Sequence, residues 1–223
     1  FVFLMFLNDA YFEMTKSFIC NQPSLLQQTM FVTTGVQLSE KLLAFHKGAY
    51  VLTNNYPESS DESSDLKYGT YAYFKLIEKR LQMQNKLIQN GMNIFIIEAD
   101  AIWNTLDIVG VLRGMMQEHE IVSANDNEND DSKAISGGFM GVRSTEKTRG
   151  FFRKYANKYT QHLASFHDHQ DDIGNDGEQH TLTPLLRESD IRVHWLSQCE
   201  SANGMWYRRR PDPKCPIPMV IQN

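Results

Sequence analysis

The sequence predicts an α/β fold in which helices flank a mainly parallel, Rossmann-like sheet. Short apolar runs alternate along the chain with longer segments of helical periodicity. The runs are continuously apolar, as expected of strands that are covered on both faces. Repeated strand–helix–strand units of this kind connect by right-handed crossovers and make neighbouring strands parallel. The first five predicted strands are 1–7, 30–33, 49–52, 94–97 and 121–123.

Helical periodicity is clearest over 66–89. Ser63, Ser64 and Asp65 are candidate N-caps, Gly91 is a candidate stop, and apolar residues recur every three or four positions. Beyond residue 123 we expect an acidic loop at 125–132, a Gly-containing strand pair or bulged strand at 134–142, a strand at 191–196 and an irregular tail at 207–218. The other predicted helices are 11–20, 39–46, 106–117, 145–165 and 178–187.

Composition indicates one globular domain over residues 1–223. The chain is 41% hydrophobic and 22% charged, which excludes disordered and fibrous classes. Its net charge of -5 argues against non-specific nucleic-acid binding. No apolar stretch is long enough to span a bilayer. The chain does not begin with Met, so we expect a piece of a longer protein, truncated at both ends.

The three cysteines leave two interpretations open. Cys199 and Cys215 could bridge a loop of about fifteen residues in an oxidising compartment. Alternatively, these two and Cys20 are buried thiols.

Two carboxylates stand where a buried strand leaves the sheet. Glu98 and Asp100 follow the run 94–97 and precede Trp103. Alternation along an extended chain directs both to the same side, and ligands of open α/β sheets collect at the carboxyl ends of strands. Paired carboxylates there suit Mg²⁺ or Mn²⁺, whose remaining ligands come from water and phosphate. The alternative is a pair of solvated loop acids.

Several segments, taken together in their order, resemble the nucleotide-diphospho-sugar transferase domain family. This family has a GT-A fold and includes relatives of plant xylosyl- and arabinosyltransferases. The resemblance covers nearly the whole chain. The segments that carry it are Asn8-Asp9-Ala10-Tyr11, Lys67-Tyr68-Gly69-Thr70 with Phe74-Lys75 and Arg80, Glu98 to Trp103, Gly137-Gly138-Phe139 with Arg143-Ser144-Thr145, and Gly177-Glu178-Gln179.

The resemblance implies a retaining transferase that moves a sugar from a UDP-sugar to a hydroxyl of a glycan or glycoprotein, with Mn²⁺ or Mg²⁺ holding the diphosphate. The family's Asp-x-Asp motif maps onto Glu98 and Asp100. Asp100 is then the direct metal ligand, and Glu98 contacts the ribose or the metal's other ligands. Glu98 departs from the family's usual Asp and is one methylene longer.

Further site residues follow from the same resemblance. Arg80 reaches the diphosphate or pairs with Glu98 or Asp100, unless it is an ordinary surface residue. Lys67 and Tyr68 contact uridine or phosphate near a helix N-terminus, where anions are favoured.

The other candidates contact the base or the sugar. Asn8 and Asp9 read the uracil or ribose, or form a simple turn. Gly137 and Gly138 let the sugar lie against the backbone, or mark a β-bulge. Glu178 or Gln179, the catalytic candidates, touches the anomeric side of the donor.

Two functional alternatives and a location complete the expectations. The domain could retain the fold and have lost turnover, acting as a UDP-sugar-binding or scaffold module. A phosphate hydrolase with Asp-x-Asp on its first strand fits less well, because here the acids follow the fourth strand. The resemblance also implies a Golgi lumen location, as a type II membrane protein whose anchor precedes residue 1.

Overall fold

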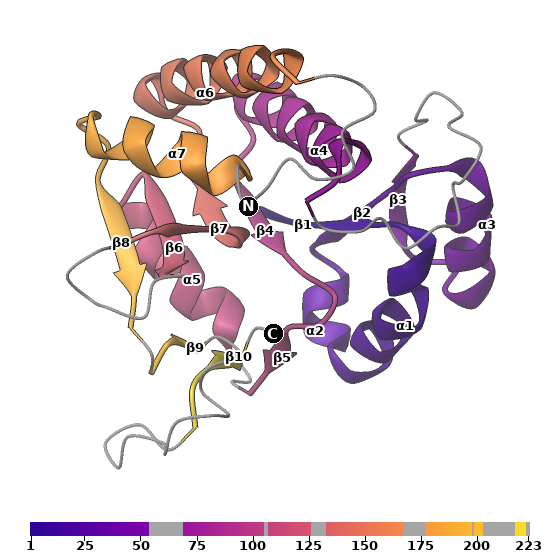
Figure 1. Ribbon diagram of the computed structural model, residues 1–223. Coiled ribbons are helices and arrows are strands. Elements are labelled where there is room, and N and C mark those ends of the chain that lie inside the picture. Colours follow the sequence, from indigo (N-terminus) through magenta and orange to yellow (C-terminus); the bar gives the residue numbers. More distant parts are fainter. Residues whose placement is uncertain are drawn as a thin grey trace. The chain divides into compact units, whose positions relative to one another are not determined.

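The computed structural model describes residues 1–53, 69–104, 107–125, 133–166, 177–197, 199–202 and 217–221. Seven strands form a sheet in the order β3-β2-β1-β4-β7-β6-β8, and a small second sheet has the order β5-β10-β9. Helices flank the main sheet (Figure 1). The predicted α/β class and mostly parallel sheet are therefore confirmed. Lys67, Tyr68, most of the acidic loop and most of the 207–218 tail lie outside the described residues.

The chain divides into two compact units whose segments interleave along the sequence. Unit 1 comprises Phe1–Asp65, Phe95–Gly114 and Leu196–Asn223, and unit 2 comprises Leu66–Ile94 and Met115–Trp195. Each unit is described separately below. A single transferase domain over 1–223 stays a prediction.

The strands of unit 1 follow the apolar runs of the sequence. β1 (Val2–Leu7), β2 (Thr29–Thr33) and β3 (Tyr50–Thr53) are parallel, with Leu4 opposite Met30 and Met30 opposite Tyr50. Each lies within one residue of its predicted bounds. β4 (Ile94–Ile97) has the predicted bounds and buries all four side chains. Continuous apolar runs thus identified strands that are covered on both faces.

The helices of unit 1 differ from the prediction at their ends. The first predicted helix divides into η1 (Asp9–Tyr11) and α1 (Phe12–Asn21). α3 (Val36–Phe45) begins three residues before its predicted start, because Gly35 is its extended N-cap. Ser39, predicted as the first residue, lies inside the helix and donates a hydrogen bond to the Gly35 carbonyl. α2 (Pro23–Leu26) was not predicted.

The small sheet was also absent from the prediction. β5 (Ile102–Trp103) pairs antiparallel with β10 (Val220–Ile221), which pairs parallel with β9 (Ser201–Ala202). Strands of two residues have no periodicity to detect, and the pairing of β5 with β10 joins segments more than one hundred residues apart.

Unit 2 contains an antiparallel strand pair. β6 (Ile121–Asn125) pairs with β7 (Ile135–Val142), with a register shift between Ser123 and Asn125. The segment predicted as a strand pair or a bulged strand is one strand, and every residue of it is buried. The register shift leaves residues 136–139 of β7 opposite a single residue of β6, which agrees with the bulged strand. β8 (Val193–Leu196) lies beside β6 in the sheet order.

Three helices pack together in unit 2: α4 (Tyr71–Gln89), α6 (Glu146–Ala164) and α7 (Glu178–Arg187). Figure 1 shows α6 lying along α4, and α7 also packs against β7. α7 has its predicted bounds. α6 begins at a capping box made by Thr145 and Thr148, one residue after its predicted start.

The beginning of α4 corrects the sequence prediction. The helix starts at Tyr71 and not at residue 66, because Thr70 is the N-cap and its hydroxyl accepts a hydrogen bond from the Tyr73 N–H. Gly69 precedes it with φ +88°, a conformation that favours glycine. Ser63, Ser64 and Asp65, the predicted caps, lie outside the described residues. α5 (Ile108–Glu118) likewise begins two residues after its predicted start.

The structure also bears on the state of the cysteines and on membrane-spanning segments. Cys199 is disulfide-bonded and Cys20 is a free, exposed thiol, so the alternative of three buried thiols is wrong. Cys215 lies outside the described residues. Among the helices in the described part of the chain, none has both the length and the apolar character needed to cross a bilayer.

Candidate functional site

Polar residues follow two neighbouring strands of unit 1. Asn8 directly follows β1, and Asp100 follows β4 by three residues. Phe3 and Phe95 lie near the beginnings of these strands, and their rings contact at a centroid distance of 5.7 Å. Neighbouring strands whose beginnings contact run in the same direction. Asn8 and Asp100 therefore follow strand ends at the same edge of the sheet, where α/β proteins bind ligands.

Each of these residues carries a buried oxygen without a hydrogen bond. Asp100 Oδ1 and Asn8 Oδ1 have no hydrogen-bond partner among the described residues. Burial raises the pKa of the Asp100 carboxyl. Buried oxygens without partners are costly, and carboxylate and amide oxygens are the ligands that Mg²⁺, Mn²⁺ and Ca²⁺ prefer. The chemistry of these two residues therefore fits a divalent cation.

Among the described residues, at most two acidic, histidine or cysteine side chains can share such a cation site. Across the ranges described above, no group of three or more His, Cys, Asp or Glu side chains is placed to hold a metal ion. Glu98 is half-buried, and its main-chain carbonyl accepts a hydrogen bond from Ala101 in the turn that carries Asp100. A cation held by one or two protein oxygens takes its other ligands from water and substrate phosphate, as Mg²⁺ commonly does.

Asp9 has a partner of its own. Its carboxylate forms an ion pair with Lys41 of α3, with Nζ and Oδ1 2.7 Å apart. The side chain of Asp9 is mostly buried, whereas that of Lys41 is largely exposed. The negative charge next to Asn8 is thus balanced within unit 1, and a contact of Asp9 with uracil or ribose stays a prediction.

Unit 2 brings together three of the predicted site residues. Arg80 of α4 forms an ion pair with Glu178, the first residue of α7. Gly137 of β7 lies against this pair: a Cβ built at Gly137 would overlap the Glu178 carboxylate and lie 3.4 Å from Arg80 Nη2. The sequence offered Glu98, Asp100 or the diphosphate as partners for Arg80. The structure pairs it with Glu178.

Two tyrosines of α6 complete this cluster. Tyr155 and Tyr159 are each 1% exposed. The Tyr155 hydroxyl donates a 3.5 Å hydrogen bond to the Glu178 main-chain carbonyl, and the Tyr159 hydroxyl is buried with no hydrogen-bond partner in the described residues. Burial, and secondarily the charge of Glu178, raises the pKa of both phenols. Both are therefore neutral hydrogen-bonding groups at any physiological pH.

The predicted residues thus fall into two groups, one in each unit. Asn8, Asp9, Glu98 and Asp100 belong to unit 1, and Arg80, Gly137, Gly138, Glu178 and Gln179 belong to unit 2. Gly138 is buried in β7, and Gln179 is half-buried in the first turn of α7. Lys67 and Tyr68 lie outside the described residues.

The sequence did not identify the tyrosines or Lys41 as part of these groups. Tyr155 and Tyr159 are four positions apart on a helix that also carries Phe151 and Phe152, and an aromatic stripe at this spacing is typical of a helix face that packs in a core. Lys41 had no distinguishing signal, because it is one of many lysines on amphipathic helices.

Comparison with known proteins identifies the family of the chain. Residues 24–222 match the family model described as nucleotide-diphospho-sugar transferase. No curated protein matches the chain.

Solved structures with a similar fold include glycosyltransferases. The galactosyltransferase LgtC, in complex with donor and acceptor sugar analogs, has a TM-score of 0.61 at 9% identity, covering 99% of this chain and 86% of its own. Mouse xyloside xylosyltransferase 1 in its apo form has a TM-score of 0.55 at 11% identity, covering 100% and 97%. A glycosyltransferase involved in glycosylation of the major capsid of PBCV-1 has a TM-score of 0.54 at 10% identity, covering 99% and 90%. At such identities the likeness shows the fold, which is GT-A.

Proposed function

Because the chain belongs to the nucleotide-diphospho-sugar transferase family, we propose that it is a metal-dependent glycosyltransferase that moves a sugar from UDP to a hydroxyl acceptor. In this reaction the bond between the anomeric carbon and the diphosphate oxygen breaks. A bond from the anomeric carbon to the acceptor oxygen forms, and the proton of the acceptor hydroxyl passes to water. UDP carries away the negative charge.

The observation that carries this proposal is the buried carboxylate oxygen of Asp100 after β4, which has no hydrogen-bond partner among the described residues. Asp100 and Asn8 would hold Mn²⁺ or Mg²⁺, with Glu98 on the same turn contacting the ribose or the metal's other ligands. When bound, the cation offsets the charge that develops on the leaving diphosphate. The raised pKa of Asp100 follows from burial, and a neighbouring cation would reverse that shift.

In unit 2 we propose that Arg80 and Glu178 contact the donor. Arg80 supplies donors in a planar fork that suits phosphate or sugar oxygens. Glu178 keeps that fork oriented and accepts hydrogen bonds from sugar hydroxyls, with Gln179 beside it in the first turn of α7. Because Arg80 already balances the charge of Glu178, we assign this carboxylate to positioning the sugar. We also propose that transfer retains the anomeric configuration.

The binding experiment measures UDP affinity with and without Mn²⁺ by calorimetry. We expect Asp100→Ala to abolish the Mn²⁺-dependent part of UDP binding while the melting temperature stays near that of the wild type. Glu13→Gln is the matched control, since Glu13 is an exposed acid on α1 that pairs with Lys16 across one helical turn. An Asp100→Ala variant that binds UDP and turns over UDP-sugar normally would place the metal site elsewhere.

The alternative function is a GT-A domain that binds UDP-sugar without turnover. The observation that favours this alternative is Glu98, which stands where the family usually has Asp. Hydrolysis of UDP-xylose, UDP-galactose, UDP-arabinose and UDP-glucose in the presence of Mn²⁺ separates the two. Intact UDP binding without turnover of any donor, in a chain extended past residue 223, would identify a scaffold.

The disulfide at Cys199 supports an oxidising compartment, and we propose the Golgi lumen.

A further inference from the structure

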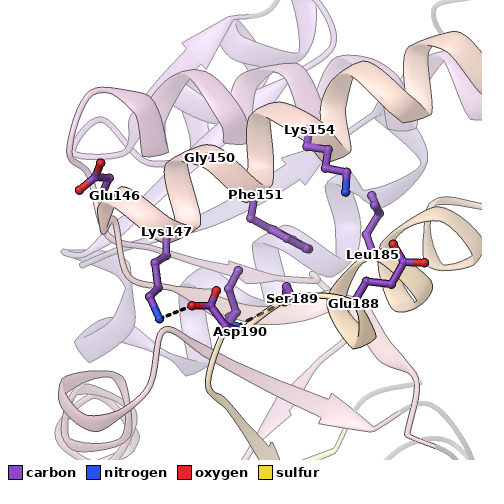
Figure 2. Close-up of a pocket in the computed structure, with 10 residues that line it drawn as sticks. Glu146, Lys147, Gly150, Phe151, Lys154, Leu185, Glu188, Ser189 and Asp190 are labelled. Carbon is purple, nitrogen blue, oxygen red and sulfur yellow. Dashed lines mark hydrogen bonds and ion pairs between the residues drawn. The ribbon is translucent and has the colours of Figure 1, made fainter.

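A pocket of about 420 Å³ opens in unit 2 between the first half of α6 and the end of α7 (Figure 2). It uses none of the residues assigned above to the donor or the metal. Its volume lies in the range of about 300–1,000 Å³ that is typical of small-molecule sites. The lining residues are Glu146, Lys147, Gly150, Phe151, Lys154, Leu185, Glu188, Ser189, Asp190 and Ile191.

One wall of the pocket is apolar. Figure 2 shows the Phe151 ring directed from α6 into the space between the two helices, with Leu185 on the opposite side. Gly150 precedes Phe151 on the same helix, and no heavy atom lies within 4 Å of the position that a Cβ would take there. Glycine is the poorest helix former after proline. At this position it leaves open space beside an aromatic ring.

The charged residues of the pocket define what it can accept. At one end Lys147 and Asp190 form an ion pair, with Nζ and Oδ2 2.6 Å apart. Towards the other end Lys154 and Glu188 are both exposed, and neither has an ion-pair partner among the described residues. Three acids and two lysines line the pocket, so a phosphate or nucleotide would meet a net negative surface.

We propose that this pocket binds a neutral monosaccharide unit of the glycan acceptor. A sugar ring has an apolar carbon–hydrogen face, which suits the exposed edge of Phe151 and the half-buried Ile191, and hydroxyls around its edge. Those hydroxyls can accept hydrogen bonds from the ammonium of Lys154 and donate hydrogen bonds to the carboxylate of Glu188. Neither interaction requires a charged ligand, which agrees with the mixed lining.

The position of the pocket suits a second sugar of an acceptor chain. α7 begins at Glu178 and ends at Arg187, so the residues at its far end lie on the order of 15 Å from the proposed donor contact. A glycan that extends away from the reacting hydroxyl could reach this far. The identity of the ligand as the acceptor rests on the proposed function, whereas binding of a neutral sugar at this pocket does not.

The experiment titrates ¹⁵N-labelled protein with methyl xyloside, methyl galactoside, methyl arabinoside and methyl glucoside, with glycerol as a control for hydroxyl groups without a ring. We expect at least one glycoside to shift the amide signals of Gly150, Ser189 and Ile191, whereas glycerol leaves them unchanged. Gly150→Leu should fill the open space and weaken this binding at least tenfold. Gly114→Leu is the matched control, because Gly114 is also helical with open space around its Cβ position.

A second variant distinguishes a loss of glycoside binding from a folding defect in Gly150→Leu. Lys154→Met keeps an exposed side chain of similar length on α6 and removes the ammonium, and it should weaken glycoside binding about tenfold. Lys158→Met, one turn further along the same helix, should not. Absence of shifts at the pocket, equal shifts from glycerol, or unchanged binding in Gly150→Leu and Lys154→Met would each overturn the proposal. UDP binding is measured in the same samples. If UDP binds and the glycosides do not, the pocket proposal fails. If UDP does not bind, the proposed function fails.

Discussion

Arg80 and Glu178 are 98 residues apart in the sequence, yet their side chains form an ion pair in unit 2. The two side chains are only 12% and 14% exposed. Helix α4 supplies the guanidinium and the first turn of α7 supplies the carboxylate, where the helix dipole also favours a negative charge. The pair thereby fixes the beginning of α7 relative to α4 within the unit.

We predict that breaking this pair costs substantial stability. Arg80→Met or Glu178→Gln alone should each lower the free energy of unfolding by about 3 kcal/mol, because each leaves one charge buried without its partner. The double variant should lose less than the sum, which a double-mutant cycle by urea denaturation measures. Glu13→Gln, at the exposed acid of the Lys16–Glu13 pair, should cost no more than about 0.5 kcal/mol. Additive effects of Arg80→Met and Glu178→Gln would contradict the pairing.

Gly137 is predicted to be required by the Glu178 side chain. Gly137→Ala places a methyl group where the carboxylate lies and should destabilise the protein by about 1–3 kcal/mol. Adding Glu178→Asp withdraws the carboxylate by one methylene and should recover part of that loss. Gly114→Ala, with nothing within 4 Å of its Cβ position, should instead stabilise α5 by about 0.5–1 kcal/mol. Thermal denaturation of the four proteins measures these effects. If Glu178→Asp recovers nothing, the contact is not the cause.

The ionised carboxylate of Asp100 is predicted to lower the stability of the folded protein and to bind the cation. Its pKa is raised in the folded protein, so the ionised carboxylate opposes folding. The unfavourable contribution is absent below the ordinary pKa of aspartate and reaches its full size as the pH rises past the raised value. Asp100→Asn should therefore increase the melting temperature at pH 7 and make no difference near pH 3.

Mn²⁺ should reverse the order of the melting temperatures of the wild type and Asp100→Asn. At pH 7, added Mn²⁺ should raise the melting temperature of the wild type, because it binds the ionised carboxylate, and should leave Asp100→Asn unchanged. Melting curves at the two pH values, each with and without Mn²⁺, test both statements. A lower melting temperature for Asp100→Asn at pH 7 without metal would show that the carboxylate has a stabilising partner.

The cysteines should contribute unequally to stability. Cys199→Ser removes a disulfide and should cost about 2–4 kcal/mol in urea denaturation. Cys20→Ser changes an exposed free thiol and should cost less than about 0.5 kcal/mol. Dithiothreitol should lower the wild-type midpoint towards that of Cys199→Ser and leave the variant's own midpoint where it is. A midpoint that does not respond to reduction in the wild type would contradict this assignment.

The sequence determined the elements of the main sheet, because their signals are local. Continuous apolar runs gave β1 to β4 nearly to the residue, and the bounds predicted for α7 are those observed. Element ends were less certain. Residue 66 was predicted to begin α4, whereas Thr70 caps it, since several polar residues before a helix can each satisfy its first N–H groups.

Only the tertiary structure decided which distant side chains meet. Nothing within a window of neighbouring residues couples Arg80 to Glu178, Gly137 to the same carboxylate, or Lys41 to Asp9, because those contacts depend on how whole helices pack. The residues that follow strand ends could be named from the sequence, since a strand's end is a local feature. Their partners could not, because pairing is a property of the folded chain.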